Sequence, residues 1–163
     1  MKYDLNEMAV KQLKLDQYIK EKITITNNQY WSDRIIALNV ELNEFINEIR
    51  FFKYWSKKPA SNKKIILDEF VDTLHFALSL SNTLGLKGLV FRMKDVKRQL
   101  SLIYLDISKK LTEVHNSFDK DLFKSLIHNI LEMAWSLGYT MEDIQEAYDK
   151  KNKVNYERQN TGY

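Results

Sequence analysis

Apolar residues recur at alternating steps of three and four along most of this 163-residue chain, which is the spacing of α-helices with one buried face. The fourth predicted segment has the most regular period, through Met93, Val96, Leu100, Ile103, Ile107, Leu111 and Val114. The pattern predicts helices ahead of residue 21, over 32–55, over 63–84, over 89–115, from Ser117–Asp121 to Gly138, and from Thr140 onward. Residues 21–31 lose the period, so we expect a connector there, with Ile23–Thr26 extended and Asn27-Asn28 in a turn.

Residues that cap or break helices stand at the predicted ends. Asp4 with Glu7, and Thr140 with Asp143, have the spacing of N-terminal capping boxes. The remaining expected caps and breaks are Ser32 or Asp33, Lys57-Lys58-Pro59, Ser61 or Asn62, and Gly85 with Gly88. Apolar content fades after Tyr148, so composition alone predicts that the polar, basic tail of about 150–163 frays.

The composition favours an all-α fold. One proline and four glycines leave few helix breakers, which predicts a bundle of about six helices with four of them in the core. The length suits one domain, 1–163, and the absence of cysteine excludes disulfides and favours a reducing cytoplasm. A net charge of +3 with mixed signs does not indicate nucleic-acid binding, and no apolar run is long enough to span a membrane.

Two pairs of acidic residues carry the candidate chemistry. Glu41 with Glu44, and Glu69 with Asp72, are each three residues apart, so each pair faces one side of a helix. Two such helices packed together would gather four carboxylates, and like charges at about 4 Å repel by roughly 4 kcal/mol at an effective dielectric near 20. A divalent cation removes that repulsion, and oxygen ligands in this number suit Mg²⁺ or Mn²⁺.

The neighbours of the second pair decide between a metal site and a solvated helix face. A glutamate pair at this spacing usually faces water. Around Glu69 and Asp72, however, the helix is apolar on most other sides, which predicts that it is largely buried. Buried acids need a partner or a metal, so the metal reading is favoured. Mg²⁺ held by carboxylates with cations opposite is the usual apparatus of phosphoryl or nucleotidyl hydrolysis.

Other catalytic patterns are missing from the sequence. A di-iron carboxylate bundle needs Glu-x-x-His on two helices, and this chain has one related pair, Asp72-x-x-His75. There is no Gly-x-x-x-x-Gly-Lys loop for a P-loop and no Gly-x-Ser-x-Gly nucleophile motif.

A few polar and aromatic residues are candidates for ligand contacts. Gln12 interrupts an apolar helix seam, where it serves either as a register device or as a contact to an amide-like edge of a ligand. Trp55 and Tyr163 could stack on a flat ring, although core packing is the stronger expectation for Trp55 alone. The basic tail could hold phosphates.

Taken together, these segments resemble the dimeric, all-α dUTP diphosphatases of Gram-positive bacteria and their phages, within the all-α NTP pyrophosphatase superfamily. The acidic segments 35–44 and 69–76 are shared across the superfamily. The segments that narrow the resemblance to dUTPases are Phe52-Lys53-Tyr54-Trp55-Ser56 and the terminal Ala147-Tyr148, Lys151-Asn152, Asn155, Arg158-Gln159 and Gly162-Tyr163. Gln12 and Leu15-Asp16 also match.

The resemblance implies Mg²⁺-dependent hydrolysis of dUTP, and of dUDP as well, to dUMP by a homodimer whose tail is ordered by the ligand. It implies that Glu41, Glu44, Glu69 and Asp72 bind the metal, with Glu44 orienting or deprotonating the water and Glu41 as the second catalytic candidate. It assigns Gln12, Trp55 and Asn155 to the uracil pocket and His75 to the deoxyribose. It assigns Lys151, Asn152 and Arg158 to the phosphates, with Tyr163 closing over the ligand.

Two alternatives stay open at this point. One is a pyrophosphatase for another non-standard nucleotide. The other is a non-catalytic helical module, such as a phage protein that binds a repressor, in which the acids are only surface. An enzyme should release pyrophosphate with Mg²⁺ and lose this activity with EDTA, whereas a pure binding module would not.

Overall fold

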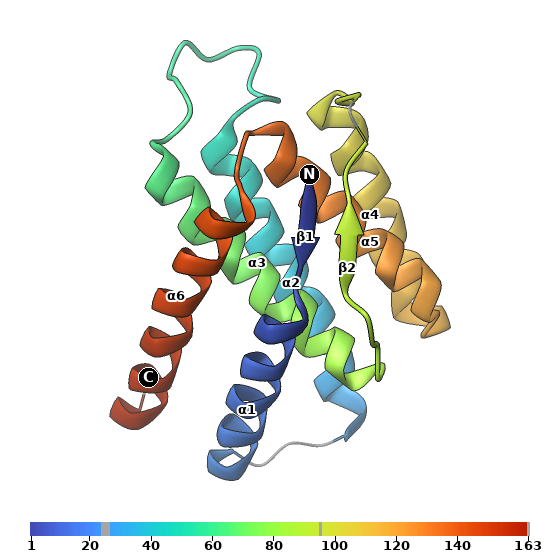
Figure 1. The fold of residues 1–163 in the computed structure, drawn as a ribbon, viewed down its shortest axis with the longest axis vertical. Helices are drawn as coiled ribbons and strands as arrows, with labels where there is room; N and C mark the ends of the chain where they lie inside the picture. The colour runs from blue at the N-terminus through green and yellow to red at the C-terminus, as the bar shows by residue number, and fades with distance from the viewer. Residues whose placement is uncertain (24–26, 95, 163) are drawn as a thin grey trace.

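The structure is a computed structural model that describes residues 1–23, 27–94 and 96–162, with the side chains of 27–29 left out (Figure 1). The described chain is all-α, as the sequence predicts. Its elements are β1 (Lys2–Asp4), α1 (Asn6–Lys22), α2 (Asn27–Ile49), α3 (Lys63–Thr83), β2 (Val90–Arg92), α4 (Leu100–Ser117), α5 (Lys120–Ser136) and α6 (Met141–Thr161). The two short strands pair antiparallel, with Tyr3 opposite Phe91.

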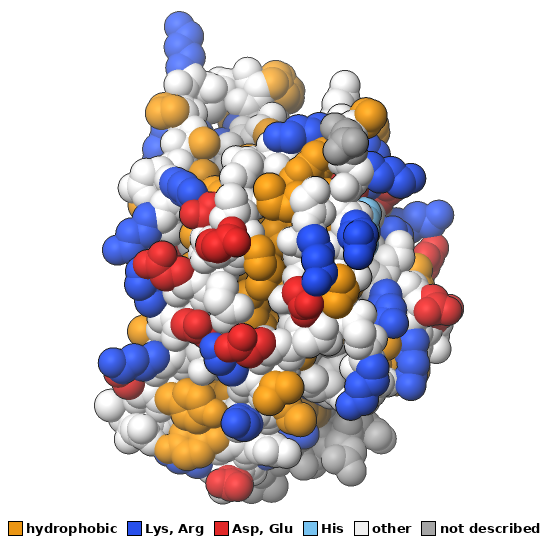
Figure 2. All heavy atoms as spheres, in the orientation of Figure 1, with side chains coloured by type: hydrophobic (Ala, Val, Ile, Leu, Met, Phe, Trp, Pro, Cys, Tyr) orange, Lys and Arg blue, Asp and Glu red, His pale blue; other side chains and the backbone are white. Residues whose placement is uncertain are grey.

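Helix α3 is the centre of the bundle. It packs on α1, α2 and α6, and α1 also packs on α6, so these four helices form one group (Figure 1). Helices α4 and α5 pack on each other and cover α2 and α3 from the other side. Figure 2 shows charged side chains of both signs spread over the face that carries α1, α6 and the sheet, in keeping with the small net charge.

The sequence of α3 explains its central position. Its side chains are buried on most sides, including Phe70, Val71, Leu74 and Leu78, and each large apolar side chain contributes about 1.5–3 kcal/mol when fully buried. Asn62 caps the helix, since its side chain accepts a hydrogen bond from Ile65 N, as predicted. Gly85, at a φ of +66°, follows its end in the left-handed region that glycine tolerates.

The predicted beginning of the first helix is wrong. Asp4 lies in β1, and α1 begins at Asn6 without a side-chain cap, so there is no capping box with Glu7. Asp4 Oδ1 instead accepts hydrogen bonds from Asn6, at 3.3 Å from its backbone N and 2.7 Å from its Nδ2. Pairing of residues 2–4 with β2 therefore outweighs the local capping signal.

The second helix is shifted relative to its prediction. It begins at Asn27, ahead of the expected cap at Ser32 or Asp33, so the turn predicted at Asn27-Asn28 is wrong. It ends at Ile49 rather than Trp55, because Arg50 has a left-handed φ of +63°. Ile23 is extended, as expected, and the rest of the predicted extended stretch lies outside the described residues.

The fourth helix is wrong over its first half. Residues 90–92 form β2, and α4 begins at Leu100. Leu89, Phe91 and Met93 are buried while Val90 and Arg92 are exposed, an alternation of two that is typical of a strand. Val96, assigned to the buried seam of a helix, is 80% exposed.

The last two helices follow their predicted caps. Asp119 caps α5, and Thr140 with Asp143 forms the capping box of α6. The tail is not frayed, because α6 continues through it to Thr161. Its far end is fixed to α1, where Lys22 Nζ donates to Gln159 O at 2.9 Å and the rings of Tyr18 and Tyr156 lie 5.2 Å apart. None of the described helices combines the length and apolarity needed to cross a membrane.

Candidate metal and nucleotide site

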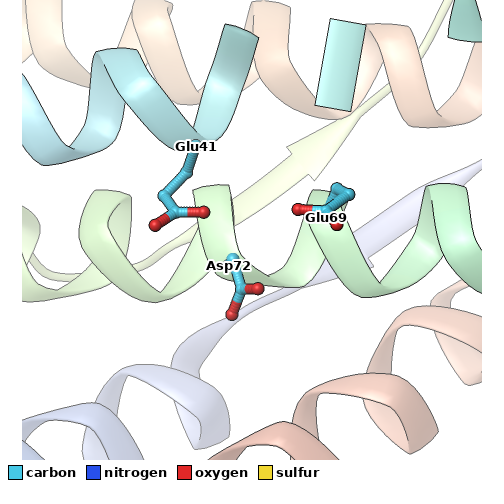
Figure 3. Close-up of side chains that lie close together, drawn as sticks. All are labelled: Glu41, Glu69 and Asp72. Atoms are coloured by element: carbon cyan, nitrogen blue, oxygen red, sulfur yellow. The ribbon is translucent and has the colours of Figure 1, made fainter. Parts of the chain in front are cut away.

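Three of the four predicted acids meet between α2 and α3. Glu41 projects from α2 toward Glu69 and Asp72 on α3, and one carboxylate oxygen from each lies within 4.8 Å of the others (Figure 3). The rings of Phe45 and Phe70, with centroids 5.3 Å apart, pack between the same two helices. The apolar seam therefore brings the acids face to face.

The fourth acid stands beside this cluster. Glu44 is exposed and lines a neighbouring hollow of about 530 Å³ together with Glu48 and Glu69. It is not one of the three residues whose oxygens converge, but its charge helps to raise the pKa of both Glu41 and Glu69.

The cluster is electrostatically strained. Burial, then the charges of Asp72, Glu44 and Glu69, raise the pKa of Glu41 to about 7. Burial and the neighbouring acids also raise the pKa of Glu69. For Asp72, burial raises the pKa and Lys151 opposes the rise, since Lys151 Nζ lies 2.5 Å from Asp72 Oδ2. Three converging oxygen donors that disfavour their own ionisation fit a hard divalent cation.

A pocket of about 360 Å³ begins at the acids. Glu41 and Asp72 border it on one side, and four of the predicted ligand residues line it: Gln12, His75, Asn155 and Arg158. Helices α1, α2, α3 and α6 all contribute to its wall. The metal candidates and most of the nucleotide candidates thus share one site.

A buried hydrogen-bond network forms the inner wall of the pocket. Gln12 Oε1 lies 2.6 Å from His75 Nδ1 and 2.9 Å from the Tyr148 hydroxyl, and Gln12 Nε2 donates to Asp16 Oδ1 at 2.8 Å. Burial lowers the pKa of His75 to about 3, so the ring is neutral and its single proton is on Nδ1, facing the Gln12 oxygen. The His75 ring stacks on Tyr148 with centroids 4.2 Å apart.

Helix α6 brings its polar residues to the site in register. Lys151, Asn155 and Arg158 follow steps of four and three, so they share one helix face. Lys151 pairs with Asp72, and the charge of Arg158 also acts on Asp72. Asn152 is half-buried, and its Nδ2 has no hydrogen-bond partner within the described part of the chain.

Two predicted ligand residues are not brought to this pocket. Trp55 lies on the connection between α2 and α3, is 65% exposed, and packs edge-on against Phe52 and Tyr54. It does not line the pocket. Tyr163 lies outside the described residues.

Sequence reasoning missed Arg34 and Tyr148. Arg34 is buried in the pocket wall, where Nη1 donates to Ser79 Oγ at 2.8 Å and Nη2 donates to Thr83 Oγ1 at 2.7 Å. Its guanidinium lies 3.9 Å from the centroid of the Tyr30 ring. The signal was the spacing, because Arg34 stands seven residues before Glu41 and therefore on the same helix face.

Comparison with known proteins agrees with this geometry. A search of curated proteins found no match. A family model described as dUTPase matches residues 4–163 and so covers nearly the whole chain, including every described residue of the acidic cluster and the pocket. The chain therefore belongs to the dUTPase family of dUTP diphosphatases, in an all-α form.

Proposed function

We propose that this enzyme hydrolyses dUTP with Mg²⁺ held by Glu41, Glu69 and Asp72. The observation that carries the proposal is the convergence of these three carboxylates at the edge of a nucleotide-sized pocket. A bound divalent cation would neutralise charge on the phosphate oxygens and lower the pKa of a coordinated water. Mn²⁺ has the same ligand preference and would substitute.

The reaction we propose is attack of water on the α-phosphorus. The water oxygen forms a bond to this phosphorus, the bond from the phosphorus to the α–β bridging oxygen breaks, and pyrophosphate leaves with that oxygen. Glu44 receives the proton of the water, because it stands beside the cluster without being one of the three converging ligands. Glu41 is the second candidate for this role. The same attack on dUDP would release phosphate in place of pyrophosphate.

The pocket supports a placement for the rest of the nucleotide. Gln12 and Asn155 line its inner part and offer amide donors and acceptors to the uracil edge. His75 lies between Gln12 and the acids in the wall and would border the deoxyribose. Lys151, Asn152 and Arg158 come from the α6 face beside Asp72 and would hold the phosphates. Trp55 does not border this pocket, so the proposal gives it no contact to the base within one subunit.

We also infer that the enzyme is a homodimer. Ile36 on α2 is 60% exposed and Leu105 on α4 is 61% exposed, and a hollow of about 550 Å³ between these helices is lined by residues of both. Exposed apolar side chains gathered at such a groove favour burial against a second copy. Sedimentation equilibrium should give twice the chain mass, and Ile36→Glu should give the chain mass; a monomeric wild type overturns the inference.

One experiment tests the activity. Purified protein is offered each deoxynucleoside triphosphate with Mg²⁺ and with EDTA, and pyrophosphate is measured. We expect dUTP to be cleaved only with Mg²⁺, and Glu69→Gln to abolish turnover while the melting temperature stays near that of the wild type. The matched control is Glu113→Gln, the same change at an exposed position of α4. Full activity of Glu69→Gln, or cleavage in EDTA, would contradict the proposal.

A further inference from the structure

The Gln12 side chain has one hydrogen-bonding group left for a ligand. A carbonyl oxygen accepts two hydrogen bonds, and Gln12 Oε1 already faces His75 Nδ1 at 2.6 Å and the Tyr148 hydroxyl at 2.9 Å. Its Nε2 carries two N–H groups and contacts one acceptor among the described residues, Asp16 Oδ1 at 2.8 Å. The side chain is only 4% exposed, and it lines the pocket. What it can still offer there is a single N–H donor.

Asp16 and Tyr148 determine which way the Gln12 amide points. In the opposite orientation Oε1 would face the Asp16 carboxylate, which is an acceptor, and Nε2 would face the N–H of the neutral His75 ring. Both contacts would be repulsive in a buried setting, where an unmade hydrogen bond costs about 1–3 kcal/mol. Burial raises the pKa of Tyr148, so its hydroxyl keeps the proton that it donates to the Gln12 oxygen. The network therefore holds the amide in one orientation.

A fixed donor distinguishes the pyrimidine bases at position 4. Uracil presents a carbonyl oxygen there, which accepts a hydrogen bond, whereas cytosine presents an amino group, which donates one. An amide free to turn would accommodate both bases. An amide held with its N–H toward the pocket would pair with uracil and meet cytosine donor to donor.

Resting on the proposed function, we propose that Asp16 and Tyr148 are specificity-determining positioning residues: they hold the Gln12 amide as a donor to the 4-carbonyl of uracil and thereby exclude dCTP. Neither residue needs to touch the reacting atoms. Their effect passes through Gln12 and so falls on recognition of the base rather than on bond cleavage.

The test compares kcat/KM for dUTP, dCTP and the two thio-analogues of dUTP. We expect Asp16→Asn and Tyr148→Phe each to lower the dUTP to dCTP ratio by about tenfold or more, mainly through KM for dUTP, with kcat changed much less. In the wild type, sulfur at position 4 is a weaker acceptor and should lower kcat/KM several-fold, while sulfur at position 2 should not. Both variants should lose this sensitivity to position 4.

Two controls separate positioning from general loss of structure. Tyr3→Phe removes another fully buried hydroxyl, which donates to Tyr139 O at 2.5 Å and lies outside the pocket lining. Asp149→Asn removes a charge next to Tyr148 whose partner is Lys11 on the surface. Both should keep the wild-type ratio. Unchanged ratios in Asp16→Asn and Tyr148→Phe, or equal sensitivity to the two thio-analogues, overturn the inference while dUTP cleavage stands. Failure of the wild type to cleave dUTP overturns the proposed function itself.

Discussion

Lys151 Nζ lies 2.5 Å from Asp72 Oδ2, so helix α6 places a cation against one of the three converging carboxylates. The ammonium occupies a position on Asp72 that a divalent ion would also use. The cluster is thus partly neutralised by the protein itself, and an ion and Lys151 are alternative partners for the same acid.

This exchange predicts a stability effect that depends on the metal. Without divalent ions, Lys151→Met should destabilise the fold by about 1–3 kcal/mol near pH 8, because three half-buried acids lose their cation. Saturating Mg²⁺ should recover most of this loss. Thermal melts with and without Mg²⁺ measure both values. Lys150→Met is the control, since its pair with Glu146 is exposed and contributes less than about 1 kcal/mol. Equal losses with and without Mg²⁺ would contradict the exchange.

The raised pKa of Glu41 predicts a pH dependence with a definite sign. The folded protein holds this proton up to about pH 7, whereas the unfolded chain releases it near the ordinary value of 4.5. Between these values the unfolded state binds fewer protons, so the contribution of Glu41 to folding free energy falls as pH rises and levels off above pH 7.

Urea titrations from pH 4.5 to 8 in EDTA check this dependence as a difference between two proteins. Relative to Glu41→Gln, the wild type should lose stability across the window, and Mg²⁺ should reduce that loss. A difference that stays flat, or that grows in favour of the wild type at high pH, would show that Glu41 is not protonated in the folded state.

Glu44 and Glu41 should separate into different roles. Glu44→Gln should lower kcat by at least about a hundredfold, the usual contribution of a positioned base, while leaving affinity for Mg²⁺ or Mn²⁺ nearly unchanged. Glu41→Gln should weaken metal binding, because it removes one of three converging oxygens. Calorimetric titration of the metal, paired with pyrophosphate release, distinguishes the two. A large loss of metal affinity in Glu44→Gln would place Glu44 among the ligands.

Arg34 should stabilise the pocket wall. Arg34→Ala leaves the Ser79 and Thr83 hydroxyls without their guanidinium partner and removes the contact with the Tyr30 ring, so we expect a loss of about 2–4 kcal/mol in unfolding free energy. Urea denaturation measures it. Arg92→Ala, at an exposed strand position, should change stability by less than about 0.5 kcal/mol. A loss at Arg34 no larger than at Arg92 would contradict the role.

The sequence predicted those parts of the site that follow from helix periodicity. Glu41, Glu69 and Asp72 could be placed because three- and four-residue spacing fixes which side of a helix a residue occupies, and an apolar seam forces those sides together. The cap at Asn62 and the capping box at Thr140 were likewise local signals that tertiary contacts left in place.

The remainder depended on contacts between distant residues. The step from a period of three and four to a period of two at Leu89–Met93 becomes decisive only because residues 2–4 are available to pair with β2. The helical tail is stabilised by α1 and Asp72, which composition does not reveal. The exposure of Trp55 follows from the left-handed Arg50, which no helix propensity predicts.

Tyr148 and Lys151 stand three residues apart on α6, so the residue that orients Gln12 and the residue that neutralises Asp72 occupy adjacent turns of one rod. A displacement of that rod would disturb base selection and ion binding at once. Occupancy of either place therefore changes the free energy of filling the other, and this coupling is reciprocal by thermodynamic necessity.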